Sequence, residues 1–535
     1  MSDSGANPPT GVRGDLEWAS IPALARSAAE RFGDKEAVVD GEARLSFVEL
    51  AAQAARVGRA FIASGIEPGD RVAIWSPNIH EWIVALLGLQ SAGAVLVPIN
   101  TRYKGAEAAY LLQASRAKAL VTVNGFLGNE YLAMLEGHDL PHLEHRIVLR
   151  GEVPAGAVAA GEFADRGESV PESELDARVA ALTGDDVADI IFTSGTTGNP
   201  KGVVCTHAQT LRGFADWAAI VGLRSDDRYL VINPFFHSFG YKAGIVACLT
   251  VGAMLVPQAV FDIPEAAANV ARHQITALPG PPAIYQTFLN HPDLDRSQLA
   301  SLRLAVTGAA PVPVELLQRM EHELGFETVV TAYGLTETCG IVSVCRPDDP
   351  PETISASSGR AIPGVEVRVV DDDGRDLPRG EPGEIVVRGY NVMQGYFEDA
   401  ERTAETIDPD GWLHTGDIGT MDADGYLAIT DRKKDMFIVG GFNAYPAEIE
   451  NLLLAHPDLA QVAVVGIPDE RMGEVGVAFA VPTAGTSPDP DEIVAWAKDQ
   501  MANYKVPRKV VLLDALPMNA SNKVLKYLLR DQAIS

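Results

Sequence analysis

Cysteine and positive charge are both scarce in this chain of 535 residues. The four cysteines (Cys205, Cys248, Cys339 and Cys345) show no C-x-x-C spacing, so neither a zinc site nor a disulfide framework is indicated. Reduced thiols fit a cytoplasmic protein, which is the location that we expect. Lysine and arginine number 43 against 72 aspartates and glutamates, which gives a net charge of −29. So acidic a surface argues against nucleic acid as a partner, and local basic groups must hold any anionic ligand.

An apolar run long enough to span a membrane is also lacking. The most hydrophobic stretch, WIVALLGLQSAGAVLVPI (residues 82–99), is interrupted by Gln90, Ser91 and two glycines. We therefore expect a helix, a turn at Gly93 and a strand instead of a membrane span. The polar residues 1–15 contain no apolar core of a signal peptide.

Strand and helix patterns alternate along most of the chain, which predicts layered α/β architecture with largely parallel sheet. An acidic, Gly/Ala-rich segment at residues 151–186 is predicted to be an exposed connection between two such regions. From about residue 355 to about 430, short strands separated by Gly, Asp and Pro turns predict a small antiparallel β unit. The charge cluster TDRKKD at 430–435 precedes an α+β tail, so we place a domain boundary there.

The stretch IIFTSGTTGNPKG (residues 190–202) joins an apolar run to a hydroxyl-rich loop and a lysine. Backbone amides, hydroxyls and an ammonium on such a loop are suited to a phosphate chain. Pro200 and Gly202 flank Lys201, so the hydroxyl of a Walker loop is missing from its position. The chain has no G-x-G-x-x-G pattern, and a dinucleotide fold is not supported either. A flexible surface turn remains the alternative to a phosphate site.

FTSGTTGNPKG resembles the signature loop of the adenylate-forming enzymes, which include acyl-CoA synthetases, luciferases and adenylation domains. Five further motifs of that family follow in family order: TGAAPVP at 307–313, TAYGLTET at 331–338, DGWLHTGD at 410–417, DRKKDMFIVGGFNAYPAEIE at 431–450 and NASNKVLK at 519–526. The resemblance implies a large N-terminal domain (1–432) of two layered α/β subdomains plus a small β-barrel. It also implies a small, mobile α+β C-terminal domain (433–535), with a hinge near Lys434.

The resemblance implies ATP and CoA as co-substrates, Mg²⁺ as the cofactor, and a site for each part of the nucleotide. The phosphates would be held by Thr193, Ser194, Gly195, Thr196, Thr197, Gly198 and Lys201. The adenine slot would be formed by Gly308, Ala309, Ala310, Tyr333 and Gly334. Thr336 is expected near the α-phosphate, and Glu337 would ligate Mg²⁺. Asp417 would accept hydrogen bonds from the ribose, with help from Arg432.

The implied reaction has two halves: a carboxylate and MgATP give an acyl-adenylate and pyrophosphate, and a thiol then displaces AMP. Lys523 would stabilise charge during the first half, together with Thr196, Glu337 and His237. Glycine usually precedes this lysine in the family, whereas this chain has Asn522. For the second half, rotation of the C-terminal domain would bring Gly440 and Gly441 to the pantetheine tunnel.

The acyl group is expected to meet the stretch FFHSFGYKAG (residues 235–244). His237 would gate the acyl pocket, and Tyr241 and Lys242 would line it. Lys242 allows two interpretations: it reaches solvent or pairs with an acid, or it hydrogen-bonds a polar group of the substrate. This stretch looks most similar to actinobacterial synthetases that activate the propionate side chain of steroid ring remnants, whose ring ketones Lys242 could meet.

Several other functions stay open on the sequence alone. The main alternative is a general medium- or long-chain fatty acyl-CoA ligase, followed by an adenylation module, for which no carrier domain follows Ser535. Luciferase-like oxidation and a non-enzymatic nucleotide-binding protein are more remote, and a homo-oligomer is left open. A metal site at His138, His142 and His145 is not expected, because Pro141 interrupts any helix there.

Overall fold

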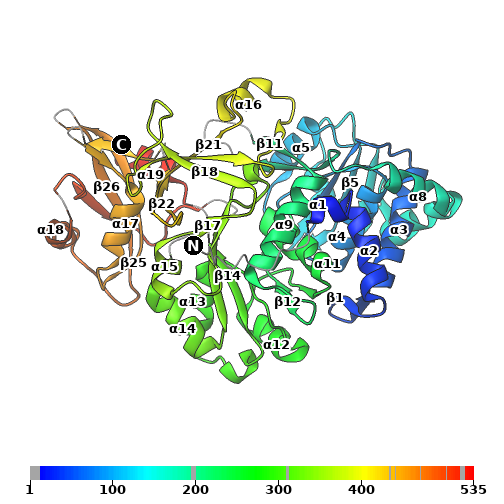
Figure 1. Ribbon diagram of the computed structural model, residues 1–535, viewed down its shortest axis with the longest axis horizontal. Coiled ribbons are helices and arrows are strands. Elements are labelled where there is room, and N and C mark those ends of the chain that lie inside the picture. Colours follow the sequence, from blue (N-terminus) through cyan, green and yellow to red (C-terminus); the bar gives the residue numbers. More distant parts are fainter. Residues whose placement is uncertain are drawn as a thin grey trace, which may run out of the picture. The chain divides into compact units, whose positions relative to one another are not determined.

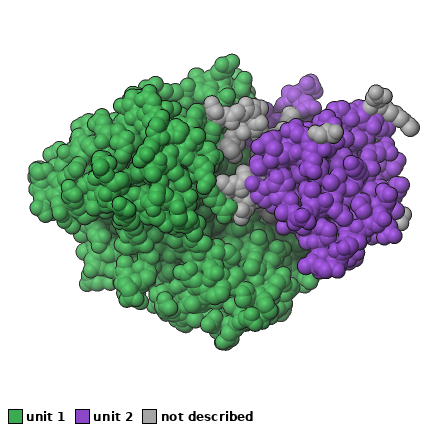
Figure 2. Space-filling model, turned by 180° about the vertical axis from the view of Figure 1, so that it is seen from behind, with its two compact units in different colours: residues 1–366, 387–413 green, residues 367–386, 414–535 purple. Residues whose placement is uncertain are grey.

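Most of the predicted elements are present in the computed structural model, which describes residues 13–193, 200–308, 312–432, 435–439, 442–469, 472–501, 503–518 and 524–534. The chain divides into two compact units. The first comprises residues 1–366 and 387–413, and the second comprises residues 367–386 and 414–535 (Figure 2). Each unit is described by itself below.

The first sheet of unit 1 carries the strands on both sides of the hydroxyl-rich loop. Its eight strands run in the order β20 (Gly395–Tyr396), β11 (Lys201–Thr206), β10 (Val187–Thr193), β4 (Val95–Pro98), β3 (Arg71–Trp75), β5 (Ala119–Thr122), β8 (His145–Val148) and β9 (Val158–Ala159). The strands from β10 to β9 pair in parallel, whereas β11 runs antiparallel to both of its neighbours. The run at 82–99 folds as predicted, into α4 (His80–Ser91), a turn at Gly93 and β4.

The second sheet region of unit 1 is built in two halves. One half has the order β12 (Arg228–Val231), β13 (Met254–Pro257), β1 (Glu36–Asp40) and β2 (Ala43–Ser46). The other has the order β14 (Leu304–Gly308), β15 (Thr328–Tyr333), β16 (Ser343–Val344) and β17 (Arg360–Ala361). Ala277 forms a parallel bridge to both Tyr229 and Leu304 and so joins the halves. Two layered α/β regions are therefore present, as predicted.

Helices cover these sheets, and α2, α3, α4 and α8 gather beside the strands drawn in blue and cyan in Figure 1. Ser46 caps α3 and Glu49 returns the hydrogen bond, which gives the helix a defined start. The helices of unit 1 are α1 (Gly14–Glu17), α2 (Ile21–Phe32), α3 (Phe47–Ala63), α4, α5 (Gly105–Ala114), α6 (Tyr131–Met134), α7 (Ala160–Asp165), α8 (Glu172–Ala181), α9 (His207–Val221), α10 (Ser238–Gly240), α11 (Ala247–Val251), α12 (Ile263–His273), α13 (Pro282–Asn290), α14 (Val314–Leu324), α15 (Pro351–Ala356) and α16 (Ala400–Thr406). Shorter elements are η1 (Arg166–Ser169), the π-helix η2 (Tyr241–Val246), η3 (Arg296–Leu299), η4 (Thr336–Thr338), β6 (Asn124–Phe126) and β7 (Asn129–Glu130).

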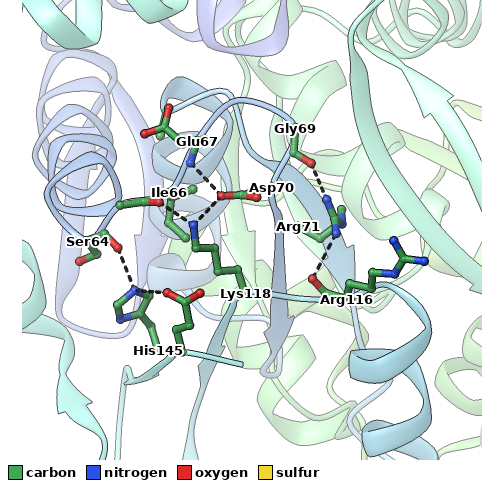
Figure 3. A network of polar contacts seen from close by, with 12 residues as sticks. Ser64, Ile66, Glu67, Gly69, Asp70, Arg71, Arg116, Lys118 and His145 are labelled. Carbon is green, nitrogen blue, oxygen red and sulfur yellow. Dashed lines mark hydrogen bonds and ion pairs between the residues drawn. The ribbon is translucent and has the colours of Figure 1, made fainter. Parts of the chain in front are cut away.

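Basic side chains close the amino end of the parallel strands β3, β5 and β8, as Figure 3 shows. Lys118 Nζ lies 2.7 Å from the carbonyl oxygen of Gly65 and 3.1 Å from the carboxylate of Asp70. Arg71 donates to the carbonyl oxygens of Ser115 and Gly69, at 2.7 and 3.0 Å. These contacts satisfy carbonyl groups in the loops at this edge. In parallel sheets of this kind, ligands bind at the opposite, carboxyl edge.

The second unit contains a small antiparallel sheet and the α+β tail. The strands β18 (Val365–Val370), β19 (Gly383–Gly389), β21 (Leu413–Met421) and β22 (Leu427–Arg432) pair in that order, and closure into the predicted barrel is not among the described pairings. The tail has the order β24 (Phe442–Ala444), β23 (Phe437–Val439), β26 (Gly473–Pro482) and β25 (Leu459–Asp469), and β27 (Lys509–Leu512) pairs with β26. Its helices are α17 (Pro446–Leu454), α18 (Pro490–Gln500) and α19 (Lys526–Ile534).

Alternating side chains of β25 give the tail two separate cores. Val462 and Val464 pack with Ile449 of α17 and Ile493 of α18, whereas Ala463 and Val465 pack on the other face with Leu529 of α19. This alternation follows from the two-residue period of a strand, whose successive side chains point to opposite faces. Helices pack on both faces, so strand and helix patterns are mixed in the sequence of the tail.

Two details differ from the sequence predictions. The segment 151–186 is not a plain connection, because it contains α7 and α8, and α8 buries Leu175 and Val179. The second unit also takes in residues 367–386 and 414–432, which the sequence places before the boundary at 432/433. In the part of the chain that the structure describes, no helix is long and apolar enough to cross a membrane.

Candidate functional site

The two strands that flank the hydroxyl-rich loop form an antiparallel pair. β10 ends at Thr193 and β11 begins at Lys201, and these two residues are opposite each other in the register. The pairing brings the ends of the loop together at the carboxyl edge of the sheet. Five predicted phosphate-binding residues lie between them, outside the described residues: Ser194, Gly195, Thr196, Thr197 and Gly198.

Tyr396 connects the predicted phosphate lysine to the predicted metal carboxylate. Its ring centroid lies 4.8 Å from Nζ of Lys201, within range of a cation–π interaction. Its hydroxyl donates a hydrogen bond of 3.1 Å to Oε1 of Glu337. Burial raises the pKa of Tyr396, and the negative charge of Glu337 raises it further, so the phenol stays a donor. Strand β20 fixes this position because Tyr396 pairs in register with Val203 of β11.

Glu337 lies in the short helix η4, which begins at Thr336 and is separated from the end of β15 by two residues. The backbone N–H of Met393 donates to the carbonyl of Glu337 at 2.9 Å, and that of Cys339 donates to the carbonyl of Thr336 at 2.9 Å. Cys339 ends the turn in the left-handed backbone conformation, with a φ of 56°, so the chain changes direction at this residue. The carboxylate is thus held on a tight, hydrogen-bonded turn.

Two glycines are required where β14 and β15 end. A Cβ on Gly308 would lie 2.5 Å from the carbonyl oxygen of Ala332, and one on Gly334 would lie 2.4 Å from that of Gly340. No larger residue fits at either position without moving backbone. Tyr333 directly precedes Gly334 and is partly exposed, and Gly308 pairs with Ala332 in the register of β14 and β15. The described residues of the predicted adenine slot therefore lie together where these strands end. Ala309 and Ala310 lie outside the described residues.

His237 and Tyr241 differ in exposure although they are close in sequence. His237 is exposed, and its Nδ1 accepts a hydrogen bond of 3.2 Å from the backbone N–H of Phe239, which leaves the proton on Nε2 of the neutral ring. Tyr241 is fully buried beside Trp82, and its hydroxyl accepts a hydrogen bond from Gln90 at 3.3 Å. His237 is therefore placed to meet a ligand, whereas Tyr241 belongs to the buried core.

Lys242 is completely enclosed in protein. Its Nζ lies 3.1 Å from Oδ2 of Asp189, and the exposed fraction of both side chains is 0%. The structure thus contains the ion pair with an acid, which is one of the two interpretations of this lysine. The enclosure argues against the other interpretation, a hydrogen bond to a ring ketone of the substrate.

In unit 2, Asp417 and Arg432 are opposite each other in the register of β21 and β22. Asp417 is 4% exposed, and its backbone N–H donates to Oγ1 of Thr415 at 3.1 Å. The buried carboxylate of Glu384 accepts hydrogen bonds from Gly416 N and interacts with His414 Nδ1, at 3.2 Å each. The two predicted ribose-binding residues are therefore neighbours on paired strands. Lys434, Gly440, Gly441 and Lys523 lie outside the described residues.

Sequence reasoning did not find Tyr396, Asp189 or Glu384. Each contacts residues distant in sequence: Tyr396 contacts Glu337, Asp189 contacts Lys242, and Glu384 contacts residues 414 and 416 of β21. A weak signal exists only for Asp189, because it is the one charge inside the apolar run VADIIF.

Another cluster has metal-ligand chemistry but a simpler explanation. Asp40, His80 and Glu81 offer ligand atoms within 4.8 Å of one another. Arg150 contacts both carboxylates, at 2.6 Å from Asp40 and 2.7 Å from Glu81, and so supplies the positive charge itself. The three histidines at 138, 142 and 145 form no such cluster among the described residues.

Comparison with known proteins gives matches over most of the chain. Residues 25–397 match the family described as AMP-binding enzyme, and residues 448–523 match the AMP-binding enzyme C-terminal domain. A protein of Rhodococcus jostii named "3-[(3aS,4S,7aS)-7a-methyl-1,5-dioxo-octahydro-1H-inden-4-yl]propanoyl:CoA ligase" is 50% identical over 96% of this chain and 98% of its own length. A Mycobacterium tuberculosis protein of the same name is 48% identical, with the same coverage of both chains.

Solved structures of similar enzymes share the fold. The anthranilate CoA ligase solved in complex with anthranoyl-AMP has a TM-score of 0.87 and 28% identity, and covers 97% of this chain and 98% of its own. The ATP-bound MatB of Rhodopseudomonas palustris has a TM-score of 0.83 and 30% identity, over 96% of this chain and 99% of its own.

Proposed function

Because the chain belongs to the AMP-binding enzyme family, we propose that it is an acyl-CoA synthetase for a hydroindanedione propionate. The carboxylate attacks the α-phosphorus of ATP and releases pyrophosphate, and the thiol of CoA then displaces AMP from the acyl-adenylate. The similarity of the whole chain to two ligases named for this propanoyl group carries the proposal for the substrate. ATP and CoA are co-substrates, and the cytoplasm, where both occur, is the proposed location.

The described residues of unit 1 supply binding and charge for the first half-reaction. Lys201 would neutralise phosphate oxygens, and its ammonium is oriented by the ring of Tyr396. Tyr333 would stack on the adenine, and Gly308 and Gly334 allow the backbone around it to pack closely. His237 would face the acyl group at the entrance of its pocket. We assign the charge stabilisation at the α-phosphate to Thr336 and Lys523.

Glu337 has the chemistry to hold Mg²⁺. Within the described residues, the hydrogen bond from Tyr396 uses Oε1, so Oε2 is left for a cation. One carboxylate together with phosphate oxygens and water suits this ion, which would neutralise charge on the phosphates when bound.

The test is release of pyrophosphate by the purified chain with a panel of acids, each with and without CoA. We expect pyrophosphate with the hydroindanedione propionate, and acyl-CoA only when CoA is present. Higher kcat/KM with a medium-chain fatty acid would favour a general fatty acyl-CoA ligase. Release of adenylate without use of CoA would favour a carrier-loading enzyme, and no release with any acid would contradict ligase activity.

A further inference from the structure

A buried ion pair joins β10 and η2, two elements of the candidate site, and has no evident role in stability. Lys242 and Asp189 are both fully enclosed, and their charged atoms are 3.1 Å apart. Removing two charges from water costs as much free energy as their attraction returns, so such a pair stabilises a fold little compared with apolar residues. Its placement therefore needs another explanation.

Asp189 depends on Lys242 for compensation. Neither carboxylate oxygen has a well-directed hydrogen bond among the described residues. Burial raises the pKa of Asp189 to about 6, although the charge of Lys242 acts to lower it. For Lys242, burial is the largest effect and lowers the pKa, but Asp189 and the neighbouring cysteine and tyrosine side chains together raise the pKa above its usual value. The ammonium thus stays charged inside the protein and holds Asp189 beside it.

The same ammonium also contacts Cys339. Nζ of Lys242 lies 3.2 Å from Sγ of Cys339, and Oγ1 of Thr210 lies 3.5 Å from that sulfur. Lys242 therefore contacts two side chains, Asp189 and Cys339, that belong to different elements.

Asp189 and Cys339 belong to the two elements that carry the predicted phosphate site and the predicted metal carboxylate. Asp189 is in β10, four residues before Thr193 along the strand. Cys339 ends the turn η4, which contains Thr336 and Glu337. Lys242 itself is in the π-helix η2, which follows His237 by a few residues. A π-helix inserts an extra residue per turn and is often found at functional sites.

A second link joins η2 and β10 at the same level. Nε2 of Gln90 donates to the carbonyl oxygen of Ala188 at 3.0 Å and to the hydroxyl of Tyr241 at 3.3 Å. Ala188 and Tyr241 directly precede Asp189 and Lys242 in the sequence. Both are thus hydrogen-bonded to Gln90 of α4. The contact between η2 and β10 therefore contains two sets of polar interactions, the ion pair and the hydrogen bonds of Gln90. These interactions are directional, so they define the relative position of the two elements more closely than an apolar contact does.

We propose that Lys242 is a positioning residue that ties the acyl-side helix η2 to strand β10 and to the turn η4, and so holds Thr193 and Glu337 in place relative to His237. The proposal rests on the proposed synthetase function, and it replaces a direct contact between Lys242 and the substrate. It predicts that the loss of Lys242 slows adenylation of every acid to the same degree.

Three variants test this proposal by ATP–pyrophosphate exchange at 25 °C and by thermal unfolding. Lys242→Met removes the cation, and Asp189→Asn/Lys242→Met removes both charges of the pair. Arg303→Met is the matched control, because Arg303 pairs with the buried Asp227 just before β14, at the end of that strand opposite to Gly308. Each variant is assayed with the hydroindanedione propionate and with the same ring acid lacking both ketones.

We expect Lys242→Met to lower kcat about tenfold or more for both acids, with the KM of each acid changed less than about twofold. The double variant should regain the Tm of the wild type but not its kcat. Arg303→Met should lower Tm and keep kcat. A KM increase confined to the diketone acid would overturn the proposal in favour of substrate contact, and recovery of kcat in the double variant would reduce the pair to a structural role.

Cys339→Ala covers the case in which Lys242→Met does not fold. It removes the contact to η4 and leaves the ion pair with Asp189, so we expect a stable protein with a several-fold lower kcat. Wild-type kcat in both Cys339→Ala and the double variant would overturn the proposal. Failure of the proposed function gives a different result, since the wild type would then show no exchange with any acid.

Discussion

At the scale of single residues, Tyr396 is the side chain on which the described phosphate and metal groups converge. It donates to Glu337 and faces Lys201. We predict that Tyr396→Phe lowers kcat of adenylation about tenfold, because a hydrogen bond to a charged group contributes about 1.5–3 kcal/mol. The Mg²⁺ concentration for half-maximal rate should rise as well, since the carboxylate loses its orientation. Pyrophosphate release at varied Mg²⁺ measures both effects.

Tyr131→Phe is a suitable control for this substitution. The hydroxyl of Tyr131 also donates a hydrogen bond, of 2.8 Å, but to the backbone carbonyl of Thr101. It should keep the Mg²⁺ dependence of the wild type. If Tyr396→Phe also keeps that dependence, Glu337 is not oriented by Tyr396, or it is not the metal ligand.

Residue identities were predictable from the sequence where a motif carries them, and contacts between distant residues were not. Thr193, Lys201 and Glu337 follow from ordered motifs, and the structure places Thr193 and Lys201 opposite each other. Lys242 stood out as a charge in an apolar run, but its partner Asp189 lies on strand β10, more than fifty residues earlier in the sequence. Which interpretation of a buried charge is right depends on tertiary packing, which no local pattern contains.

At the scale of elements, the start of helix α2 is joined to the start of helix α9 by a buried histidine. The backbone N–H of Ile21, the first residue of α2, donates to Nδ1 of His207, the first residue of α9, at 3.3 Å. This bond satisfies an N–H group that the helix itself leaves unpaired. Burial lowers the pKa of His207 to about 4, because a charged imidazole would lose its hydration there.

Stability should therefore fall in acid through His207. Below pH 6.5 the unfolded chain binds a proton that the folded chain does not, so this contribution is complete above that pH and is lost toward pH 4. Of the roughly 3 kcal/mol involved, about 2 kcal/mol should be lost by pH 5. His207→Asn keeps an acceptor near Nδ1 without a titrating group. Urea unfolding at pH 7 and pH 5 should show a smaller decrease for the variant, and equal decreases would contradict the assignment.

Elements were predicted best where a pattern is strong. The apolar run at 82–99 was predicted to be a helix, a turn at Gly93 and a strand, and it folds as α4, that turn and β4. The helix α8 was not predicted, because only Leu175 and Val179 are buried in it and its other positions are polar or alanine. Two buried residues one turn apart are too few to give a recognisable apolar stripe.

At the scale of the whole molecule, a large and a small unit were predicted, but the line between them was drawn from composition. The structure assigns residues 414–432 to the second unit, where Asp417 of β21 pairs with Arg432 of β22. A charge cluster marks a change of amino-acid composition along the sequence, whereas a compact unit is defined by contacts such as this strand pairing. The hinge at Lys434 is a separate matter and stays a prediction.

Lys434→Pro tests whether the C-terminal domain must change orientation between the half-reactions. Proline fixes φ near −65°, so it would restrict a backbone rotation at this position. We expect ATP–pyrophosphate exchange near the wild-type rate and formation of acyl-CoA slowed about tenfold or more, because hinge residues absorb the backbone change of a domain motion. Lys434→Ala removes the same side chain but leaves the backbone free, and it should support both half-reactions. Equal loss of the two half-reactions in Lys434→Pro would show that residue 434 is not the hinge, and a matching loss of acyl-CoA formation in Lys434→Ala would assign the effect to the ammonium group instead of the backbone.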